Sequence, residues 1–306
     1  MRCDVIDFVQ RDSDATQFTM LQASPGTGAA AAGAPAAPGP IDADRLAALY
    51  AYPPYARPCL RVNFIASIDG AVALEGRSGR LGGPGDKAVF ALLRSLADVI
   101  VVGAGTVRTE NYGGARISKE VQEARRAEGR APVPPIAVVS ASARIDPGHR
   151  VFHDTAVPPL LLTSRGADPA RLRALAGTGA EIVVLPDLPE HRTAVDAGFR
   201  GADGEGPVPD VGAIAPLLAE RGRPRILCEG GPNLTGRLLA SGAVDELCLT
   251  TAPVLVGGNA PRMAAGGAAT PTPMVRRHLL TDGDGALFAR WAAPQPPHGQ
   301  EPRGKR

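Results

Sequence analysis

The chain has 306 residues, of which 44% are apolar and 21% are charged, and its formal net charge is +2. This length suits one large domain or two small ones, and the apolar fraction is sufficient for a hydrophobic core. The nearly neutral charge, with arginines spread along the chain, excludes an extended basic surface for nucleic acid or for an anionic membrane.

Membrane, secretory and metal-binding classes are also disfavoured. No apolar run approaches the roughly 20 residues that a membrane-spanning helix needs. Acidic residues at the N-terminus occupy positions where a signal peptide would be apolar. The four cysteines lack the spacing of a metal site, and Cys228 and Cys248 lie in apolar runs typical of buried thiols. We therefore expect no metal, no nucleic-acid or membrane partner, and a cytoplasmic location.

The first part of the chain differs in composition from the rest. Residues 1–57 form an N-terminal extension, in which residues 24–40 are mostly Ala, Gly and Pro and predict a flexible, partly disordered segment. A short helix is predicted over residues 42–50, beginning at an aspartate and ended by prolines. One folded domain is expected over residues 58–292, followed by a disordered, Pro-rich tail over residues 293–306.

Within this domain, short apolar runs alternate with amphipathic segments. Strands are predicted over 60–66, 99–102, 136–140, 160–163, 182–185, 226–229 and 246–253, with a closing hairpin over 279–281 and 286–291. Helices are predicted over 86–96, 169–176, 211–220 and 232–240, a helix or mobile excursion over 117–131, and a loop over 187–209. Such apolar strands, separated by helices, favour an α/β fold with a mostly parallel sheet covered by helices on both faces. The consecutive strands near the end of the chain predict a mixed sheet edge.

The most informative motif follows the strand over residues 226–229. Glu229 comes at the strand's carboxyl end, and Gly230, Gly231 and Pro232 lead into the next helix. Proline suits the first helical position, because its missing N–H would have no partner there. The free N–H groups of such a helix start bind anions, and open α/β sheets place ligands at this edge. The motif therefore predicts a site for a phosphorylated cofactor, although the same glycines could simply end a strand.

Two other strand ends carry candidate functional residues. Gly103, Gly105 and Thr106 follow an apolar strand, but Arg108 stands where the dinucleotide fingerprint has its third glycine, so ordinary tight packing explains this turn equally well. At the other strand end, Asp69 follows Ser67 in a turn, and alone it is typical of an aspartate that caps its own backbone. Among the charged residues near these turns, Arg94 stands out because it interrupts an apolar helix face.

Five segments, in this order, resemble a known family. They are residues 63–70, 85–94, 97–107, 229–239 and 244–258. Together they are similar to the reductase domain of riboflavin biosynthesis, the pyrimidine reductase family with a dihydrofolate-reductase-like fold, over roughly residues 58–292. The resemblance implies an NADPH-dependent reductase of a pyrimidine-type substrate, 5-amino-6-(5-phosphoribosylamino)uracil above all. It also implies a homodimer built around the strand at residues 246–253, a run that equally suits a central strand of the monomer.

The resemblance also implies roles for individual residues. The cofactor would contact Ala66, Gly103, Gly105, Thr106, Gly230, Gly231, Pro232, Asn233, Leu234 and Thr235. The substrate would contact Asn63, Ser67, Ser78, Arg80, Arg94, Glu110 and Arg116, with Arg94 on a ribose phosphate. Asp69 and Glu229 are the predicted catalytic carboxylates: Asp69 would position the acceptor and its proton, and Glu229 would hydrogen-bond the substrate or the nicotinamide amide. Desolvation at a strand end is one way in which the pKa of such a carboxyl group can be raised, but the sequence does not show that it is.

Recognition of the NADPH 2′-phosphate has two candidate loops. One begins at Ser140 and includes Ser142 and Arg144, and the other begins at Thr163 and includes Ser164 and Arg165. Either loop supplies hydroxyls and a guanidinium suited to a phosphate.

The sequence departs from the family in one loop. Residues 109–116 replace an Asp-Asn-Pro-x-Leu-type loop that ends in arginine, with Glu110 at the acidic position and Arg116 at the position of the arginine. The H-x-E and P-C-x-x-C motifs of the zinc deaminase domain do not occur, so we expect no deaminase activity. Because the changed loop falls where phosphate recognition should be, reduction of a dihydropterin such as dihydrofolate is an alternative. A non-catalytic NADP-binding protein is a second alternative.

Overall fold

A computed structural model describes residues 16–23, 39–54, 57–188, 208–266 and 271–294. The strands are β1 (Phe18–Ala23), β2 (Gly39–Ile41), β3 (Cys59–Ser67), β4 (Val99–Gly103), β5 (Ile136–Val139), β6 (Leu160–Thr163), β7 (Glu181–Val184), β8 (Arg225–Cys228), β9 (Glu246–Ala252), β10 (Val275–Thr281) and β11 (Leu287–Ala292). The α-helices are α2 (Ala43–Tyr50), α3 (Pro84–Leu96), α4 (Ala104–Thr109), α5 (Lys119–Ala127), α6 (Arg150–His153), α7 (Pro169–Ala176), α9 (Ile214–Glu220) and α10 (Pro232–Ser241). Two 3-10 helices, η1 (Ser78–Arg80) and η4 (Val211–Ala213), complete the assignment.

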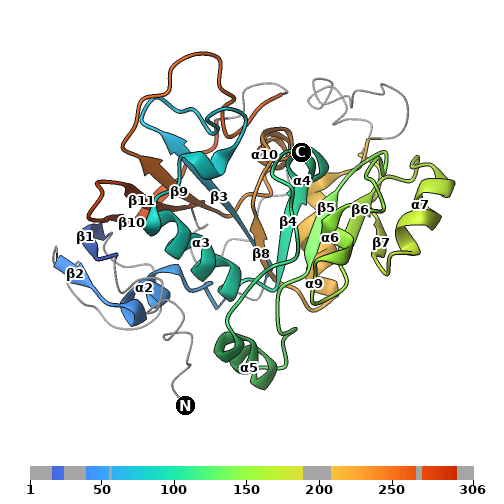
Figure 1. Cartoon of the computed structure of the whole chain (residues 1–306), viewed down its shortest axis with the longest axis horizontal. Coiled ribbons are helices and arrows are strands. Elements are labelled where there is room, and N and C mark those ends of the chain that lie inside the picture. Colours follow the sequence, from blue (N-terminus) through green and yellow to red (C-terminus); the bar gives the residue numbers. More distant parts are fainter. Residues whose placement is uncertain (1–15, 24–38, 55–56, 189–207, 267–270, 295–306) are drawn as a thin grey trace.

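In these described residues, eleven strands form one sheet in the order β2-β1-β10-β11-β9-β3-β8-β4-β5-β6-β7 (Figure 1). Neighbours from β9 to β7 run parallel. The pairs from β2 to β9 run antiparallel. The predicted α/β class with a mostly parallel, mixed sheet is therefore confirmed. No described helix combines the length and apolar character that a membrane crossing requires.

Each face of the sheet packs against its own layer of helices. In β4, Ile100 and Val102 belong to the core shared with α2, α3 and α5, whereas Val99 and Val101 face α9 and α10. This division follows from the alternation of side chains along a strand. Because β4 is buried on both faces, its sequence reads as one continuous apolar run.

The fold begins earlier in the chain than predicted. β1 pairs with β10 and β2 pairs with β1, so residues 18–23 and 39–41 extend the sheet beyond the predicted start of the domain. α2 follows, begun as predicted by Asp42, whose side chain accepts a hydrogen bond from the Arg45 N–H. Most of the predicted linker and tail, and of the loop predicted over 187–209, lie outside the described residues.

β9 is an internal strand. It pairs with β3 on one side and with β11 on the other, so both of its edges carry hydrogen bonds within the chain. The predicted position of a homodimer contact, at an edge of this strand, is therefore wrong, because both edges of β9 are paired within the chain. The alternative, a central strand of the monomer, is what the structure shows.

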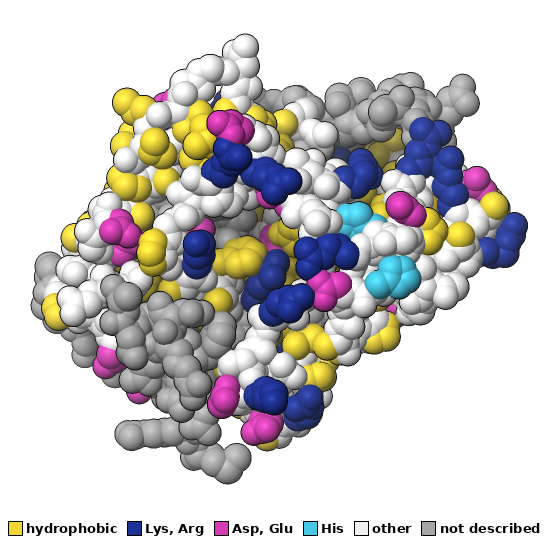
Figure 2. Space-filling view, viewed as in Figure 1, with side chains coloured by type: hydrophobic (Ala, Val, Ile, Leu, Met, Phe, Trp, Pro, Cys, Tyr) yellow, Lys and Arg dark blue, Asp and Glu magenta, His cyan; other side chains and the backbone are white. Residues whose placement is uncertain are grey.

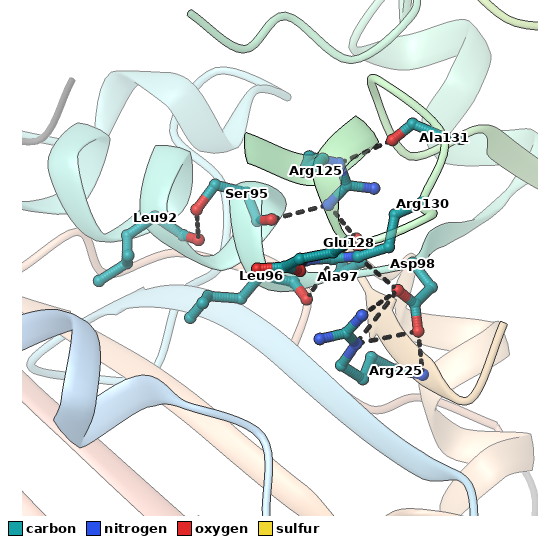
Figure 3. A network of polar contacts seen from close by, with 10 residues as sticks. All are labelled: Leu92, Ser95, Leu96, Ala97, Asp98, Arg125, Glu128, Arg130, Ala131 and Arg225. Atoms are coloured by element: carbon teal, nitrogen blue, oxygen red, sulfur yellow. Dashed lines mark hydrogen bonds and ion pairs between the residues drawn. The ribbon is translucent and has the colours of Figure 1, made fainter. Parts of the chain in front are cut away.

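Two arginines cap the end of α3 (Figure 3). The Arg125 Nη1 donates to the carbonyl oxygens of Ser95 and Ala97, each at 2.7 Å. The Arg130 Nη2 donates to the carbonyl oxygens of Leu96 and Ala97, at 2.9 and 2.8 Å. The last carbonyls of a helix have no partner within the helix, so these donors satisfy groups that would otherwise be buried unpaired.

Asp98 supplies the charge that this cluster requires. Its buried carboxylate accepts from the Arg130 Nε at 3.0 Å and from the Arg225 backbone N–H and guanidinium at 2.9–3.1 Å. Asp98 therefore joins the start of β4, the end of α5 and the start of β8. These contacts fix the C-terminal end of α3 relative to the sheet.

We expect Asp98→Ala to lower the free energy of unfolding by about 3 kcal/mol, because it leaves two arginines without their buried counter-charge. Glu128→Ala is the matched control, since the Glu128 side chain is 46% exposed and bonds the same Arg130. The control should change stability by less than about 0.5 kcal/mol. Urea denaturation of both variants measures the difference, and equal losses would contradict this account of the cluster.

Candidate active site

A cavity of about 960 Å³ opens at the carboxyl ends of β3, β8, β4 and β5. Its lining comes from these strand ends, from α3, from the start of α10 and from the loop over residues 109–116. Five cationic side chains line it: Lys87, Arg94, Arg116, Arg150 and Arg237. Figure 2 shows Lys and Arg side chains gathered near the middle of the face that contains α3 and α6. A cavity of this size with positive charge suits an anionic ligand.

The two glycine turns predicted at separate strand ends lie against each other. The Gly103 N–H donates to the Gly230 carbonyl oxygen at 2.8 Å. A Cβ on Gly231 would lie 2.3 Å from the Thr106 Oγ1, and one on Gly230, whose φ is +90°, would lie 2.8 Å from the Phe64 ring. Both glycines are therefore required by contact, and the two turns together form a wall in which Gly103, Gly105 and Gly231 bring backbone to the cavity lining.

α10 begins directly behind this wall. Gly231 is its N-cap and Pro232 its first residue, as the sequence predicts. Asn233 and Leu234 follow along the cavity lining. The first N–H groups of a helix have no intrahelical partner, so this end of the cavity offers backbone donors and the positive end of a helix dipole.

Glu229 lies at the centre of a polar cluster in the cavity. Its Oε1 accepts from the Arg94 Nε and its Oε2 from the Arg94 Nη2, both at 2.7 Å, and Oε2 also accepts from the Tyr112 hydroxyl at 2.6 Å. The Arg94 guanidinium also stacks 4.2 Å from the Phe90 ring centroid. Burial alone lowers the pKa of Arg94, but the Glu229 carboxylate outweighs this and raises it above its ordinary value. Arg94 thus remains a cation that Glu229 already neutralises.

Asp69 has a different position from the one predicted. Its carboxylate accepts from the Ser67 hydroxyl at 2.5 Å and from the N–H groups of Val256 and Gly257 at 3.2 and 2.7 Å. These bonds, that from Ser67 first, lower the pKa of Asp69 to about 2. Desolvation therefore does not raise the pKa of Asp69, because the side chain is exposed and its carboxylate accepts these hydrogen bonds. Neither Asp69 nor Ser67 lines the cavity.

The remaining predicted substrate residues separate into two groups. Asn63, Ser78, Glu110 and Arg116 line the cavity with Arg94. Within this group, Ser78 donates through both its N–H and its hydroxyl to Glu110 Oε1, at 2.8 and 2.9 Å. Arg80 does not line the cavity and instead pairs with Glu75 at the surface.

Several predicted cofactor residues are set back from the cavity surface. Ala66, Ser140, Thr163, Gly230 and Thr235 are absent from its lining, whereas the other predicted cofactor residues belong to it. Thr163 is fully buried, and its hydroxyl donates to the Ala141 carbonyl oxygen at 3.2 Å. The Ser164 hydroxyl donates to the same oxygen at 2.9 Å. The two candidate phosphate loops are thus joined, and Ala141 is the residue that reaches the cavity.

Among the cavity residues that sequence reasoning missed are Asp86, Lys87, Phe90, Tyr112 and Arg150. Asp86 and Phe90 lie eight and four positions before Arg94, and helical spacing places all three on one face. That spacing was the available signal. The sequence contains no such signal for Tyr112 or Arg150. Arg150 belongs to α6 and reaches the site through contact with the loop at residues 109–116. In the described residues, no group of three His, Cys, Asp or Glu side chains could hold a metal.

Comparison with known proteins agrees with the family resemblance seen in the sequence. The family model described as the RibD C-terminal domain matches residues 58–288. A protein of Methanothermobacter thermautotrophicus named 2,5-diamino-6-ribosylamino-4(3H)-pyrimidinone 5′-phosphate reductase is 32% identical over 215 residues, covering 69% of this chain and 85% of that protein. A protein of the same name from Archaeoglobus fulgidus is 29% identical over 203 residues, covering 66% and 83%.

Solved structures agree. A pyrimidine reductase-like protein from Corynebacterium diphtheriae superposes with a TM-score of 0.60 at 28% identity, covering 78% of this chain and 93% of that one. The riboflavin biosynthesis reductase Rib7 of Saccharomyces cerevisiae gives a TM-score of 0.56 at 15% identity, covering 83% of this chain and 100% of that one. This second likeness shows a shared fold.

A pair of Tyr→Phe variants tests the cluster around Glu229. We expect Tyr112→Phe to lower the free energy of unfolding by about 1.5–2 kcal/mol, because it removes a hydrogen bond to a charged group. Tyr52→Phe is the control, since the Tyr52 hydroxyl is buried without a hydrogen-bond partner among the described residues. Removing that hydroxyl should be neutral or stabilising. If urea denaturation gave the reverse order, the bond to Glu229 would not stabilise the fold.

Proposed function

The chain belongs to the RibD C-terminal domain family and is an oxidoreductase, and we propose that it uses NADPH to reduce a 6-ribosylaminopyrimidine 5′-phosphate. Its fold is the dihydrofolate-reductase-like α/β fold predicted from the sequence. The single observation that carries the proposal is the meeting of two glycine turns at the start of α10, beside a cavity that continues to Arg94 and Glu229.

The residues present fit a nicotinamide dinucleotide. The wall to which Gly103, Gly105 and Gly231 contribute lets a pyrophosphate approach the backbone, and the first turn of α10 supplies donors and a favourable dipole. When bound, the reduced nicotinamide supplies a hydride to an electrophilic carbon. The strand end at Ala66 is where we place the nicotinamide ring, next to the cavity residues Asn63 and Ile65.

The opposite side of the cavity suits the pyrimidine and its phosphate. Phe90 offers a ring face, and we propose that the Glu229 carboxyl oxygens, oriented by Arg94, accept a hydrogen bond from a substrate N–H. Arg116 and Arg150 both pair with Asp154, and the distance from the Arg116 Nη2 to the Asp154 carboxylate is 2.9 Å. Because two guanidinium groups share one carboxylate, the three side chains together keep one net positive charge. We propose that this pair, rather than Arg94 alone, receives the phosphate.

Preference for NADPH requires a group that binds the 2′-phosphate. We propose the loop that begins at Ser140, because Ala141 lines the cavity and Arg144 follows it, whereas the hydroxyls of Thr163 and Ser164 are committed to the Ala141 carbonyl. A cytoplasmic homodimer completes the proposal. The described cysteines are buried free thiols, and the exposed apolar side chains of Val254 and Leu255 suit contact with a second copy.

A second candidate is reduction of a dihydropterin such as dihydrofolate. One observation favours it: Arg94, the predicted phosphate ligand, is already neutralised by Glu229. Five cationic side chains around the cavity and the names of the relatives favour the pyrimidine. A protein that bound NADPH but reduced neither compound would be a non-catalytic NADP-binding protein.

The direct test follows NADPH oxidation at 340 nm with the 2-amino pyrimidine, its uracil counterpart and dihydrofolate at matched concentrations. We expect turnover with a ribosylaminopyrimidine phosphate and at least about tenfold higher kcat/KM with NADPH than with NADH, because charge-assisted bonds to a phosphate contribute about 1.5–3 kcal/mol. Arg144→Ala should reduce this preference and Arg165→Ala should retain it. Turnover of dihydrofolate alone would replace the pyrimidine by the second candidate.

Asp69→Asn tests the predicted catalytic role of that residue. We expect turnover to fall by less than tenfold, since the structure gives Asp69 the role of holding the loop at residues 256–257. Loss of a general acid or base typically costs about a hundredfold or more. A hundredfold loss with unchanged thermal stability and NADPH binding would restore Asp69 to the reaction.

A further inference from the structure

Asp86 is a cavity carboxyl group to which no role has yet been given. It lies in the first turn of α3, and its carboxyl group is close to the backbone of Gly82, where a Cβ would come within 2.7 Å of the Asp86 Oδ2. Both residues line the cavity. The glycine therefore leaves the space that the carboxyl group occupies.

The surroundings of Asp86 disfavour its charged form. Burial raises the pKa of Asp86 above its ordinary value, and the nearby carboxylate of Asp282 raises it further. A hydrogen bond from the Thr250 side chain and the charge of Lys87 oppose this rise without cancelling it. Asp282, in the turn between β10 and β11, lies directly against α3, since a Cβ on Gly85 would be 2.2 Å from its Oδ2. Tyr50 of α2 is the other titratable group coupled to Asp86, and burial keeps Tyr50 neutral by raising its pKa.

Asp86 also lies at the end of the cavity where we place the nicotinamide. Its partner Thr250 is opposite Ile65 in the β3–β9 pairing, one residue before Ala66. Glu229 occupies the other end, because Arg94 is eight residues along the same helix and eight residues of α-helix span about 12 Å. Asp86 and Glu229 therefore face the two ends of one ligand site.

The other cavity carboxyl groups are held as hydrogen-bond acceptors. Besides Asp86, the described lining contains Glu110 and Glu229. Glu229 accepts three hydrogen bonds from Arg94 and Tyr112, and Glu110 accepts two from Ser78. Asp86 differs from both, because a second carboxyl group, that of Asp282, lies near it and its own surroundings favour the protonated form.

We propose that Asp86 is the general acid of the reduction and gives its proton to the ring oxygen of the ribosylamine. The C1–O bond of the sugar breaks as the ring oxygen takes this proton, and the exocyclic nitrogen forms a double bond to C1. Bound NADPH would supply the hydride that C1 accepts and would be oxidised in doing so, and the electron pair of the double bond would return to nitrogen. The substrate would thus gain one hydride and one proton, and the Asp86 carboxylate would regain a proton from solvent. This step depends on the proposed function.

Single-turnover rates across pH test the proposal. We expect Asp86→Asn to slow reduction by about 10²–10⁴-fold, the usual contribution of a general acid. In the wild type, the rate should fall as pH rises through the pKa of Asp86, and in Asp86→Asn this limb should be absent. NADPH affinity, measured by fluorescence, should be unchanged. A variant that kept the wild-type rate and the same limb would overturn the proposal.

Asp282→Asn supplies a control that leaves the acid in place. Asparagine keeps the Oδ1 that accepts from the N–H groups of Asp284 and Ala286, at 3.1 and 2.9 Å, and removes only the charge. The rate at low pH should be unchanged, and the limb should move to lower pH because the repulsion that raises the Asp86 pKa is lost. A limb that stayed in place would contradict the assignment to Asp86.

A measurement without substrate separates this proposal from the proposed function. The pKa of Asp86 is higher in the folded protein than in the unfolded chain, so the folded state binds the proton more tightly. The free energy of unfolding therefore falls as pH rises through the window between these two pKa values. Asp86→Asn should abolish this fall and be more stable than the wild type above the window. Absence of wild-type turnover would refute the function and with it the catalytic step. Equal pH dependence of stability in both proteins would refute the protonated Asp86.

Discussion

The ion pair between Arg94 and Glu229 is the contact on which the cavity depends, because it joins α3 to the carboxyl end of β8. Both charges are largely removed from water, which is costly unless the geometry is good and the remaining lone pairs are satisfied. Two parallel bonds at 2.7 Å and a third from Tyr112 meet that condition. The pair therefore fixes the distance between helix and sheet, and with it the width of the cavity.

The rest of α3 is held to the same frame. At its C-terminal end, Arg125 and Arg130 satisfy the last carbonyls and Asp98 balances their charge. The wall formed by the two glycine turns differs in character, since Gly103, Gly105 and Gly231 bring backbone to the cavity lining. One side of the cavity is thus a rigid helix that presents charged and aromatic side chains, and the other is a surface of peptide groups. This division is what a ligand with a diphosphate at one end and a polar ring at the other requires.

Local sequence patterns predicted most strands and helices, and they predicted the glycine motifs at their correct strand ends. They failed where the decisive partner is distant in sequence. β1 forms because it pairs with β10, which lies more than 250 residues later in the chain. The sequence of Phe18–Ala23 contains no pattern that identifies this partner. Thr163 was assigned to the cofactor by its position after a strand, but the alternation of side chains turns it into the core. The pattern over residues 86–96 predicts an amphipathic helix, but it does not reveal that Asp86 and Phe90 border a cavity.

Two carboxyl groups of the cavity, those of Glu229 and Asp86, have different surroundings, and α3 contributes to both. At Arg94, a guanidinium and a tyrosine hydroxyl donate hydrogen bonds to Glu229. Two turns earlier, Asp86 meets a second carboxylate and a hydroxyl. Different environments allow an enzyme to use one carboxyl group as an acid and another as a hydrogen-bond acceptor. Because both environments are set from α3, any shift of this helix would alter both groups together. The cap at residues 95–98 therefore matters to the chemistry as well as to the fold.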